Sequence, residues 1–200
     1  MSPAATETQS PRFQGYRWMD IDACPSPALR QRYHIANNVV HWDSLVMIAE
    51  EARNRLSKCH LNPKIGWGGQ HMIREVCFDD GVSWIAKLPM WPVSRDDTGT
   101  YQFDRSFWTD QQAREMQIEV DTMNFLATSS SIPVPRVHAA ETSCGNPVNL
   151  PYMLMDAIRG NVVTDMGNPV MGKKVPAQYI EKYLSSLAQI HVQSPYEKTK

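Results

Sequence analysis

Apolar residues recur along the chain with two periods, one typical of helices and one typical of strands. Stripes at intervals of three and four residues predict amphipathic helices over 43–57, 110–127 and 176–193. Asp43 is placed to cap the first of them, and a shorter helix is expected around 28–33, followed by extended chain to residue 42. Short runs of alternating or continuous apolar residues predict five strands, at 59–65, 71–78, 82–88, 136–141 and 152–156.

Turn residues between these runs indicate how the strands connect. Asp79-Asp80-Gly81 separates two strand patterns, and Asp-Gly favours a tight hairpin turn because glycine adopts positive φ. Gly66-Trp67-Gly68-Gly69 ends the first predicted strand, and residues 89–109 form a long insertion rich in aromatic side chains. The order of elements predicts an α+β fold, with a five-stranded antiparallel sheet and one helix that crosses it.

Composition and charge narrow the classes of protein. The 200 residues are 42% apolar and 20% charged, which is typical of a folded globular chain. The net charge of −1 gives no basic field, so neither nucleic acid nor a membrane surface is expected as a partner. Residues 1–15 are small and polar, and we expect them to be disordered.

Cysteine usage favours a reducing compartment. The four cysteines are widely scattered and form no Cys-x-x-Cys pair or Cys/His ligand spacing. A zinc site and a disulfide framework are therefore disfavoured, and reduced thiols in a cytoplasmic protein are the simpler interpretation.

A lysine interrupts the third predicted strand. Alternation places Lys87 beside Ile85 on one face of a strand that is otherwise apolar on both faces. Lysine is seldom buried without an anionic partner. Glu119 lies on the apolar stripe of the 110–127 helix and is the candidate partner, with Glu115 one turn earlier as a rival. Either glutamate could instead lie in solvent, as most helix glutamates do.

Two further features have both a functional and a purely structural interpretation. The glycines at 66–69 could bring backbone N–H groups close to a phosphate, or simply allow a tight turn. The apolar strand at 152–156 runs into a break at Arg159-Gly160. Its end could be a hinge whose backbone groups bind a flat heterocycle, or an ordinary turn after a buried strand.

Six segments, taken in order, carry a resemblance to a known family. They span about residues 16–192 and read YRWMD, LRQRY, DDGVSWIAKLP, EVDTMNFLATSSSIPVPRV, LPYMLMDAIRGNVV and YLSSLAQIH. The series resembles the aminoglycoside phosphotransferase (APH)/choline-kinase-like enzymes, which have a protein-kinase-like fold. The resemblance implies a kinase-like small lobe over 16–158, with an N-terminal extension and helix, and the start of an incomplete large lobe over 159–200.

The resemblance also implies roles for eight residues in nucleotide binding. Lys87 would contact the α and β phosphates of ATP, and Glu119 would hold the lysine in place. The loop over the phosphates would be formed by Gly66, Gly68 and Gly69. Met155 would be the gatekeeper residue, and the backbone groups of Asp156 and Ile158 would bind the adenine edge.

The reaction implied is transfer of the ATP γ-phosphate to a hydroxyl of a small molecule, with Mg²⁺. In the family, a His-Gly-Asp type motif supplies the aspartate that activates the acceptor hydroxyl, and a later aspartate holds Mg²⁺. Neither has a counterpart here, where the only His-x-Asp is His41-Trp42-Asp43. We therefore expect a chain truncated before the catalytic loop, without catalytic or metal-binding residues, which binds nucleotide and is inactive alone.

Two alternatives belong to other classes. A non-catalytic, pseudokinase-like interaction module would use the aromatic insertion and the unfinished large lobe to bind a protein partner. A non-functional fragment is the second alternative. The acceptor molecule is left open, because acceptor-binding residues in the family come mostly from the large lobe.

Overall fold

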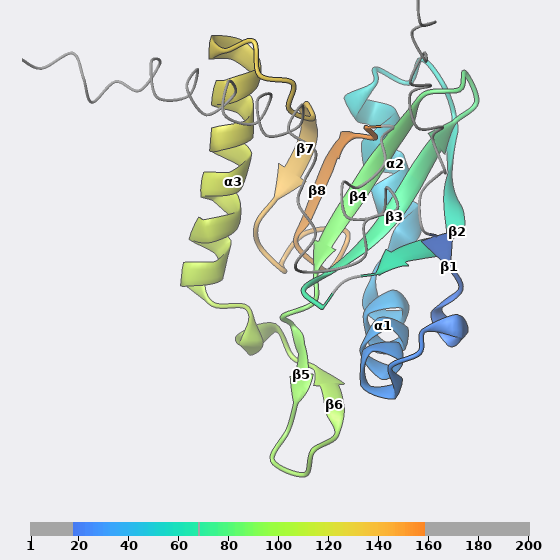
Figure 1. Ribbon diagram of the computed structural model, residues 1–200, viewed down its shortest axis with the longest axis vertical. Coiled ribbons are helices and arrows are strands. Elements are labelled where there is room, and N and C mark those ends of the chain that lie inside the picture. The colour runs from blue at the N-terminus through green and yellow to red at the C-terminus, as the bar shows by residue number, and fades with distance from the viewer. Residues whose placement is uncertain (1–17, 68, 159–200) are drawn as a thin grey trace, which may run out of the picture.

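The computed structural model describes residues 18–67 and 69–158 (Figure 1). The expected disorder over 1–15, the helix over 176–193 and the start of a large lobe over 159–200 lie outside the described residues. Within the described ranges the fold is α+β, with three α-helices and antiparallel strands. No helix in these ranges is long and apolar enough to cross a membrane.

A six-stranded antiparallel sheet forms the centre of the fold, with its strands in the order β1-β2-β3-β4-β8-β7 (Figure 1). The bounds are Trp18–Met19 for β1, Cys59–Trp67 for β2, His71–Phe78 for β3, Ser83–Pro89 for β4, Val137–Glu141 for β7 and Tyr152–Asp156 for β8. The five longer strands are those that the sequence predicted, but the expected count of five strands is wrong, because the two-residue strand β1 adds a sixth and is too short to give an alternating pattern. The chain leaves β4, forms a helix, and returns so that β8 pairs with β4.

The predicted Asp-Gly turn joins β3 to β4. Gly81 has a φ of +86°, which glycine adopts without strain. The Phe78 amide donates to the Val82 carbonyl at 2.9 Å and closes the hairpin.

The outer edge of β2 is irregular. The short strand β1 covers β2 only at Ile65 and Gly66. The register of β2 against β3 shifts between Leu61 and Ile65. Pro63, which has no backbone N–H, and the exposed Lys64 lie in that stretch.

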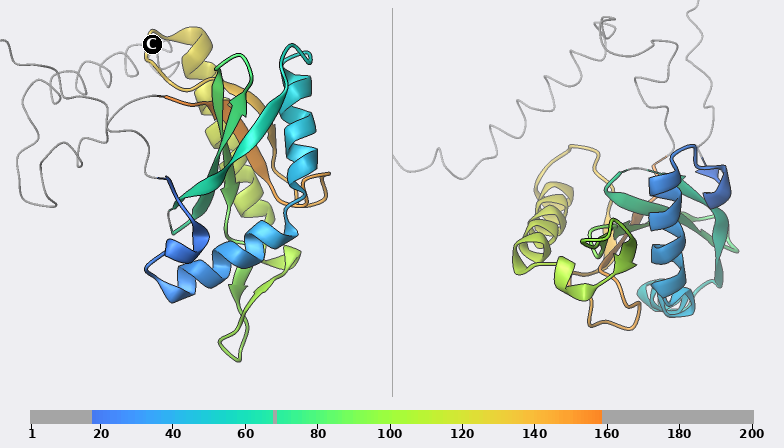
Figure 2. Two further views of the ribbon diagram at one scale, coloured as in Figure 1. Left: turned by 90° about the vertical axis from the view of Figure 1, so that its right-hand side faces the viewer. Right: turned by 90° about the horizontal axis from the view of Figure 1, so that it is seen from below.

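Helices cover both faces of the sheet, as the view from below in Figure 2 shows. α1 (Pro27–Val39) and α2 (Trp42–Ala52) lie on one face, and α3 (Asp110–Ser129) lies on the other. The main core lies between the sheet and the first two helices. It is built from alternate positions of β3 and β4 and from both helices, with Met72, Val76, Trp84, Ala86, Leu88, Tyr33, Ala36, Leu45 and Ala49 buried.

α3 is packed more lightly than the other two helices. A capping box starts it, in which the Thr109 hydroxyl accepts from the Gln112 amide and the Gln112 side chain accepts from the Thr109 amide. Val120 is its one buried residue, whereas Ile118 and Phe125 are 63% and 48% exposed. α3 therefore contacts the sheet through a narrow stripe.

The expected helix at 28–33 is wrong in length, because α1 continues to Val39. The Ser26 hydroxyl caps its start by accepting from the Leu29 amide. Tyr33 and Ala36 are both fully buried in the core, so the packed face of the helix continues beyond the predicted end. The extended chain expected up to residue 42 is wrong for the same reason.

α2 differs from its prediction at both ends. Its N-cap residue is His41, so Asp43 lies in the first turn, where a negative charge still interacts favourably with the helix dipole. The helix ends at Ala52 rather than near residue 57. Asn54 and Arg55 adopt positive φ values of 54° and 57°, which end the helical path.

The aromatic insertion after β4 folds into a hairpin and a short helical turn. β5 (Val93–Arg95) pairs with β6 (Tyr101–Phe103), and a 3-10 turn follows at Arg105–Phe107. The hairpin packs against α1. Val93 is fully buried, so part of the insertion belongs to the core.

Candidate functional site

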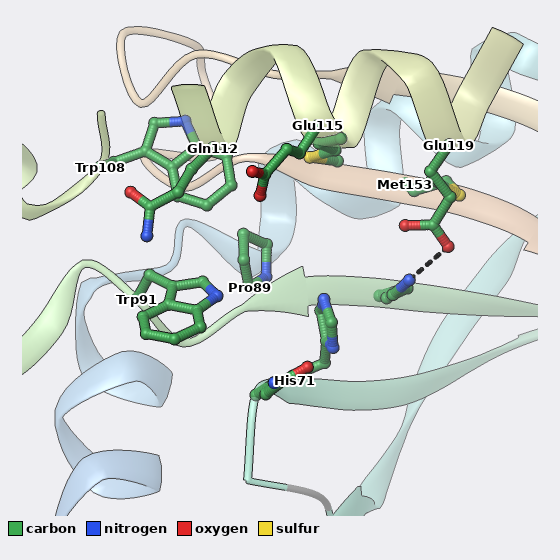
Figure 3. A pocket seen from close by; sticks show the side chains of 11 residues that line it. His71, Pro89, Trp91, Trp108, Gln112, Glu115, Glu119 and Met153 are labelled. Atoms are coloured by element: carbon green, nitrogen blue, oxygen red, sulfur yellow. Dashed lines mark hydrogen bonds and ion pairs between the residues drawn. The ribbon is translucent and has the colours of Figure 1, made fainter. Parts of the chain in front are cut away.

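Lys87 lies on the face of the sheet that carries α3. Alternation along β4 directs Trp84, Ala86 and Leu88 into the core on the opposite face. The Lys87 side chain is 17% exposed, and its Nζ lies 2.5 Å from Oε1 of Glu119 on α3 (Figure 3). The ion pair predicted between these two residues is confirmed.

Glu115 is not the partner of Lys87. It points into the same cavity from α3 (Figure 3) and accepts a hydrogen bond from Gln111 Nε2 at 3.0 Å. Its carboxylate therefore adds negative charge to the cavity without pairing with the lysine.

The strand register surrounds Lys87 with side chains on its own face. Ile73 of β3 and Met153 of β8 lie directly opposite it, one on each side. Directly opposed residues of antiparallel strands point to the same face. The next row along the sheet is formed, in order, by Glu75, Ile85 and Met155. Four of these five neighbours, all except Glu75, are thus apolar side chains on the face of Lys87.

A cavity of about 240 Å³ lies between α3, β4 and the chain that enters β3. Lys87 and Glu119 form one end of it, and the indoles of Trp91 and Trp108 lie toward the other (Figure 3). Trp108 is fixed because its Nε1 donates to the Thr142 carbonyl at 2.7 Å, whereas Trp91 is 47% exposed. The cavity therefore has an ionic end and an aromatic end.

The charges in the lining sum to a small negative value. Lys87 contributes +1, and Glu115 and Glu119 contribute −1 each, which gives −1 with His71 neutral. Burial lowers the pKa of His71 first, the charge of Lys87 lowers it further, and Glu119 acts in the opposite direction. The imidazole is therefore neutral at pH 7. Among the described lining residues, Lys87 is the cationic side chain, so the charge distribution favours an anion beside Lys87 over one beside Glu115.

The Lys87 ammonium has donors left for a ligand. It carries three N–H groups, of which Glu119 accepts one. Within residues 18–67 and 69–158 no second acceptor is bonded to it. The oxygens of an anion could accept hydrogen bonds from the remaining N–H groups, and Glu119 would hold the ammonium in place.

Gly66 and Gly69 do not line the cavity. Gly66 lies in β2, where an added Cβ would be 3.2 Å from Trp18 Cζ3 and 3.3 Å from Ile73 Cβ, so packing accounts for this glycine. Gly69 has open space around it, and its carbonyl accepts from Arg32 Nη1 at 3.1 Å. Gly68 lies outside the described residues.

The predicted hinge residues also lie outside the cavity lining. Met155 lies on the face that carries α3. The Asp156 amide donates to the Arg136 carbonyl at 3.0 Å, its carboxylate accepts from the Arg136 amide, and Oδ1 lies 2.7 Å from His138 Nε2. Asp156 is therefore engaged with the chain around β7. Ile158, at the end of the described range, is 52% exposed.

Sequence reasoning missed His71 and Met153 as lining residues. His71 alternates with Ile73 and lies two residues after Gly69, so its position had a detectable signal. Met153 had none, because its place beside Lys87 depends on the register of β8 against β4.

The described part of the chain has no group of three or more His, Cys, Asp or Glu side chains that could hold a metal ion. The one carboxylate at the lysine end, Glu119, is already paired with Lys87. These residues therefore do not provide a protein site for Mg²⁺. Comparisons with protein-family models, with curated proteins and with solved structures found no match for this chain.

Proposed function

We propose that the Lys87–Glu119 cavity binds the phosphates of ATP, and that the chain is the nucleotide-binding part of a small-molecule phosphotransferase with a kinase-like small lobe. The ion pair is the observation that carries the proposal. A strand lysine on the side of the sheet away from the main core is held at 2.5 Å by a helix glutamate and lines a cavity. A purely structural lysine needs no cavity beside it.

The charge distribution supports binding at the ionic end. Lys87 is largely shielded from water, so its attraction for phosphate oxygens is stronger than that of an exposed lysine. The lining as a whole carries a charge of −1, which disfavours a bare, highly charged anion. ATP in complex with Mg²⁺ carries less negative charge, and the metal would then be held by the phosphates.

The order of elements supports the same proposal. Three antiparallel strands, a helix that carries the glutamate, and two strands that return beside β4 follow the order that the phosphotransferase resemblance implies. The base would lie over Ile85 and Met155, which share the face of Lys87. At its edge, Asp156 would contribute only its carbonyl, because its amide is bonded to Arg136, together with the backbone of Ile158.

For this chain we propose that it binds the nucleotide, and not that it catalyses phosphoryl transfer. Phosphoryl transfer relies on positioning and charge stabilisation by a catalytic aspartate and bound metal. The 200 residues contain no His-Gly-Asp motif. Transfer of the γ-phosphate to a small-molecule hydroxyl is thus proposed for the family reaction.

Calorimetric titration with Mg·ATP tests the proposal, using Lys87→Ala and, as a matched control, Lys64→Ala. Lys64 is an exposed lysine on β2 of the same sheet. Losing a charge-assisted hydrogen bond costs about 1.5–3 kcal/mol, so Lys87→Ala should weaken binding about tenfold or more. Lys64→Ala should stay within about twofold of the wild type. A wild type indifferent to Mg·ATP, or equal binding by Lys87→Ala, contradicts the proposal.

One observation favours the interaction module as a second candidate. Ile118 and Phe125 are exposed and lie seven residues apart, on the same side of α3. If this surface binds a protein partner or a second copy of the chain, Ile118→Ser with Phe125→Ser abolishes that association in sedimentation experiments, and Lys87→Ala preserves it. Equal association by the wild type and the double variant contradicts this candidate.

A further inference from the structure

Arg32 joins α1 to two backbone segments beside the cavity. Its Nη1 donates to the Gly69 carbonyl at 3.1 Å, its Nη2 to the Met90 carbonyl at 2.7 Å and its Nε to the Val93 carbonyl at 3.1 Å. Gly69 belongs to the turn before β3, and the other two belong to the chain that leaves β4. One guanidinium thus holds two segments that are far apart in sequence.

These two segments carry walls of the cavity. Gln70 and His71 directly follow Gly69, and Trp91 directly follows Met90; all three of these side chains line the cavity. The Met90 amide also donates to the Gln70 carbonyl at 2.8 Å. The guanidinium is not part of the lining, so it acts on the walls from outside.

Among the described residues, Gly69 has no side-chain packing to hold it before β3. Gly69 is exposed, and nothing lies within 4 Å of the place where its Cβ would be. Backbone without side-chain packing opens locally at low cost in free energy. The planar fork of an arginine can donate to several carbonyls at fixed angles, whereas the compact ammonium of a lysine cannot span them.

We propose that Arg32 is a positioning residue for this cavity. It fixes the distance between Gly69, before β3, and the chain that leaves β4, so that the cavity keeps the shape in which Lys87 binds phosphate. Through Arg32, α1 thereby sets the affinity for Mg·ATP without contacting the nucleotide. The inference rests on the proposed function, and assigns to α1 a role beyond covering the core.

The first test compares Arg32→Lys with Arg30→Lys as a matched control. Arg30 lies on the same helix, and both its Nε and its Nη2 donate to the Cys24 carbonyl, at 3.2 and 2.9 Å. Both bonds of Arg30 end at Cys24, which belongs to neither of the two segments that Arg32 holds. We expect similar, small losses of thermal stability in both variants. Mg·ATP binding should weaken about fivefold to tenfold in Arg32→Lys and stay within about twofold in Arg30→Lys.

Amide hydrogen exchange provides a readout that does not depend on the nucleotide. In Arg32→Lys, peptides covering 69–72 and 90–94 should exchange about tenfold faster than in the wild type, while peptides from the β3–β4 hairpin stay unchanged. Arg32→Ala leaves space for a guanidinium group. Added methylguanidinium should therefore restore both slow exchange and Mg·ATP affinity in Arg32→Ala, and should do nothing for Arg30→Ala.

The outcomes separate this inference from the proposed function. If the wild type binds Mg·ATP but Arg32→Lys binds equally well with unchanged exchange, the role of Arg32 is refuted and nucleotide binding stands. If the wild type does not bind Mg·ATP, both the proposed function and the effect of Arg32 on affinity are refuted. Amide exchange then decides only whether Arg32 holds the two cavity segments in place. A general loss of protection over the whole sheet would show a merely structural role and overturn the inference.

Discussion

At Gly66 the absence of a side chain is a packing requirement of the sheet edge. A Cβ there would lie 3.2 Å from the Trp18 ring and 3.3 Å from Ile73 Cβ, and one of these neighbours would have to move. Gly66→Ala should therefore destabilise the fold by about 1–3 kcal/mol, as overpacking of a filled site does. Chemical denaturation of the purified variant measures the change.

Gly69 supplies the matched control for this prediction. It has free space around its Cβ position and no positive φ, so Gly69→Ala should be neutral or stabilise by up to about 1 kcal/mol. Equal destabilisation by both substitutions would show that the packing around Gly66 is not the cause.

His71 reports on the charges of the cavity. Lys87 lowers the pKa of His71 and Glu119 raises it, in addition to the larger effect of burial. Lys87→Met should therefore raise the pKa of His71, and Glu119→Gln should lower it, in an NMR titration of the imidazole. A pKa that does not respond to either substitution would place His71 outside the field of the ion pair.

The same pKa shift determines a pH dependence of stability. A folded-state pKa below the ordinary 6.5 means that the unfolded chain binds more protons in the interval between the two values. The contribution of His71 is fully present above pH 6.5 and is lost as the pH falls through 6.5 toward the folded-state pKa. His71→Gln should flatten this part of the profile.

At the scale of elements, α3 is the helix that positions Glu119, and its stability depends more on its ends than on burial. The Thr109 hydroxyl accepts from the Gln112 amide at 3.3 Å in the capping box. Thr109→Ala should cost about 0.5–2 kcal/mol of unfolding free energy. Because Val120 is its one buried residue, lost capping should also shorten the helix in circular dichroism.

Thr122→Ala is the control for the cap, since Thr122 is an exposed position inside α3. Alanine is the better helix former, so this change should stabilise by up to about 0.7 kcal/mol. If both threonine variants behaved alike, the capping box would not be what holds the start of α3.

At the scale of the whole molecule, local sequence patterns predicted the five longer strands and their antiparallel sheet, but not the order in which β8 and β7 return beside β4. Alternation and the Asp-Gly turn identify β3 and β4 because both signals are local. The length of α1 was missed because burial of Tyr33 and Ala36 in the core extends the helix beyond the expected end. Tertiary packing overrode the local signal there.

The candidate site was likewise predictable from the sequence only in part. The Lys87–Glu119 pair was predictable, because a charge on an apolar strand and a charge on an apolar helix stripe each need a partner. Its surroundings were not. Met153 depends on strand register, and the three acceptors of Arg32 are backbone carbonyls, which every residue possesses and no sequence pattern marks.

The irregular edge of β2 has a consequence for how molecules of this protein meet one another. An exposed, regular edge strand is a template for pairing with a strand of a neighbouring molecule, which is a route to aggregation. Pro63 withholds a donor, Lys64 adds a charge, and the register shift between Leu61 and Ile65 breaks the straight row of hydrogen-bonding groups. The side of the sheet that β1 leaves uncovered is thereby protected against strand addition.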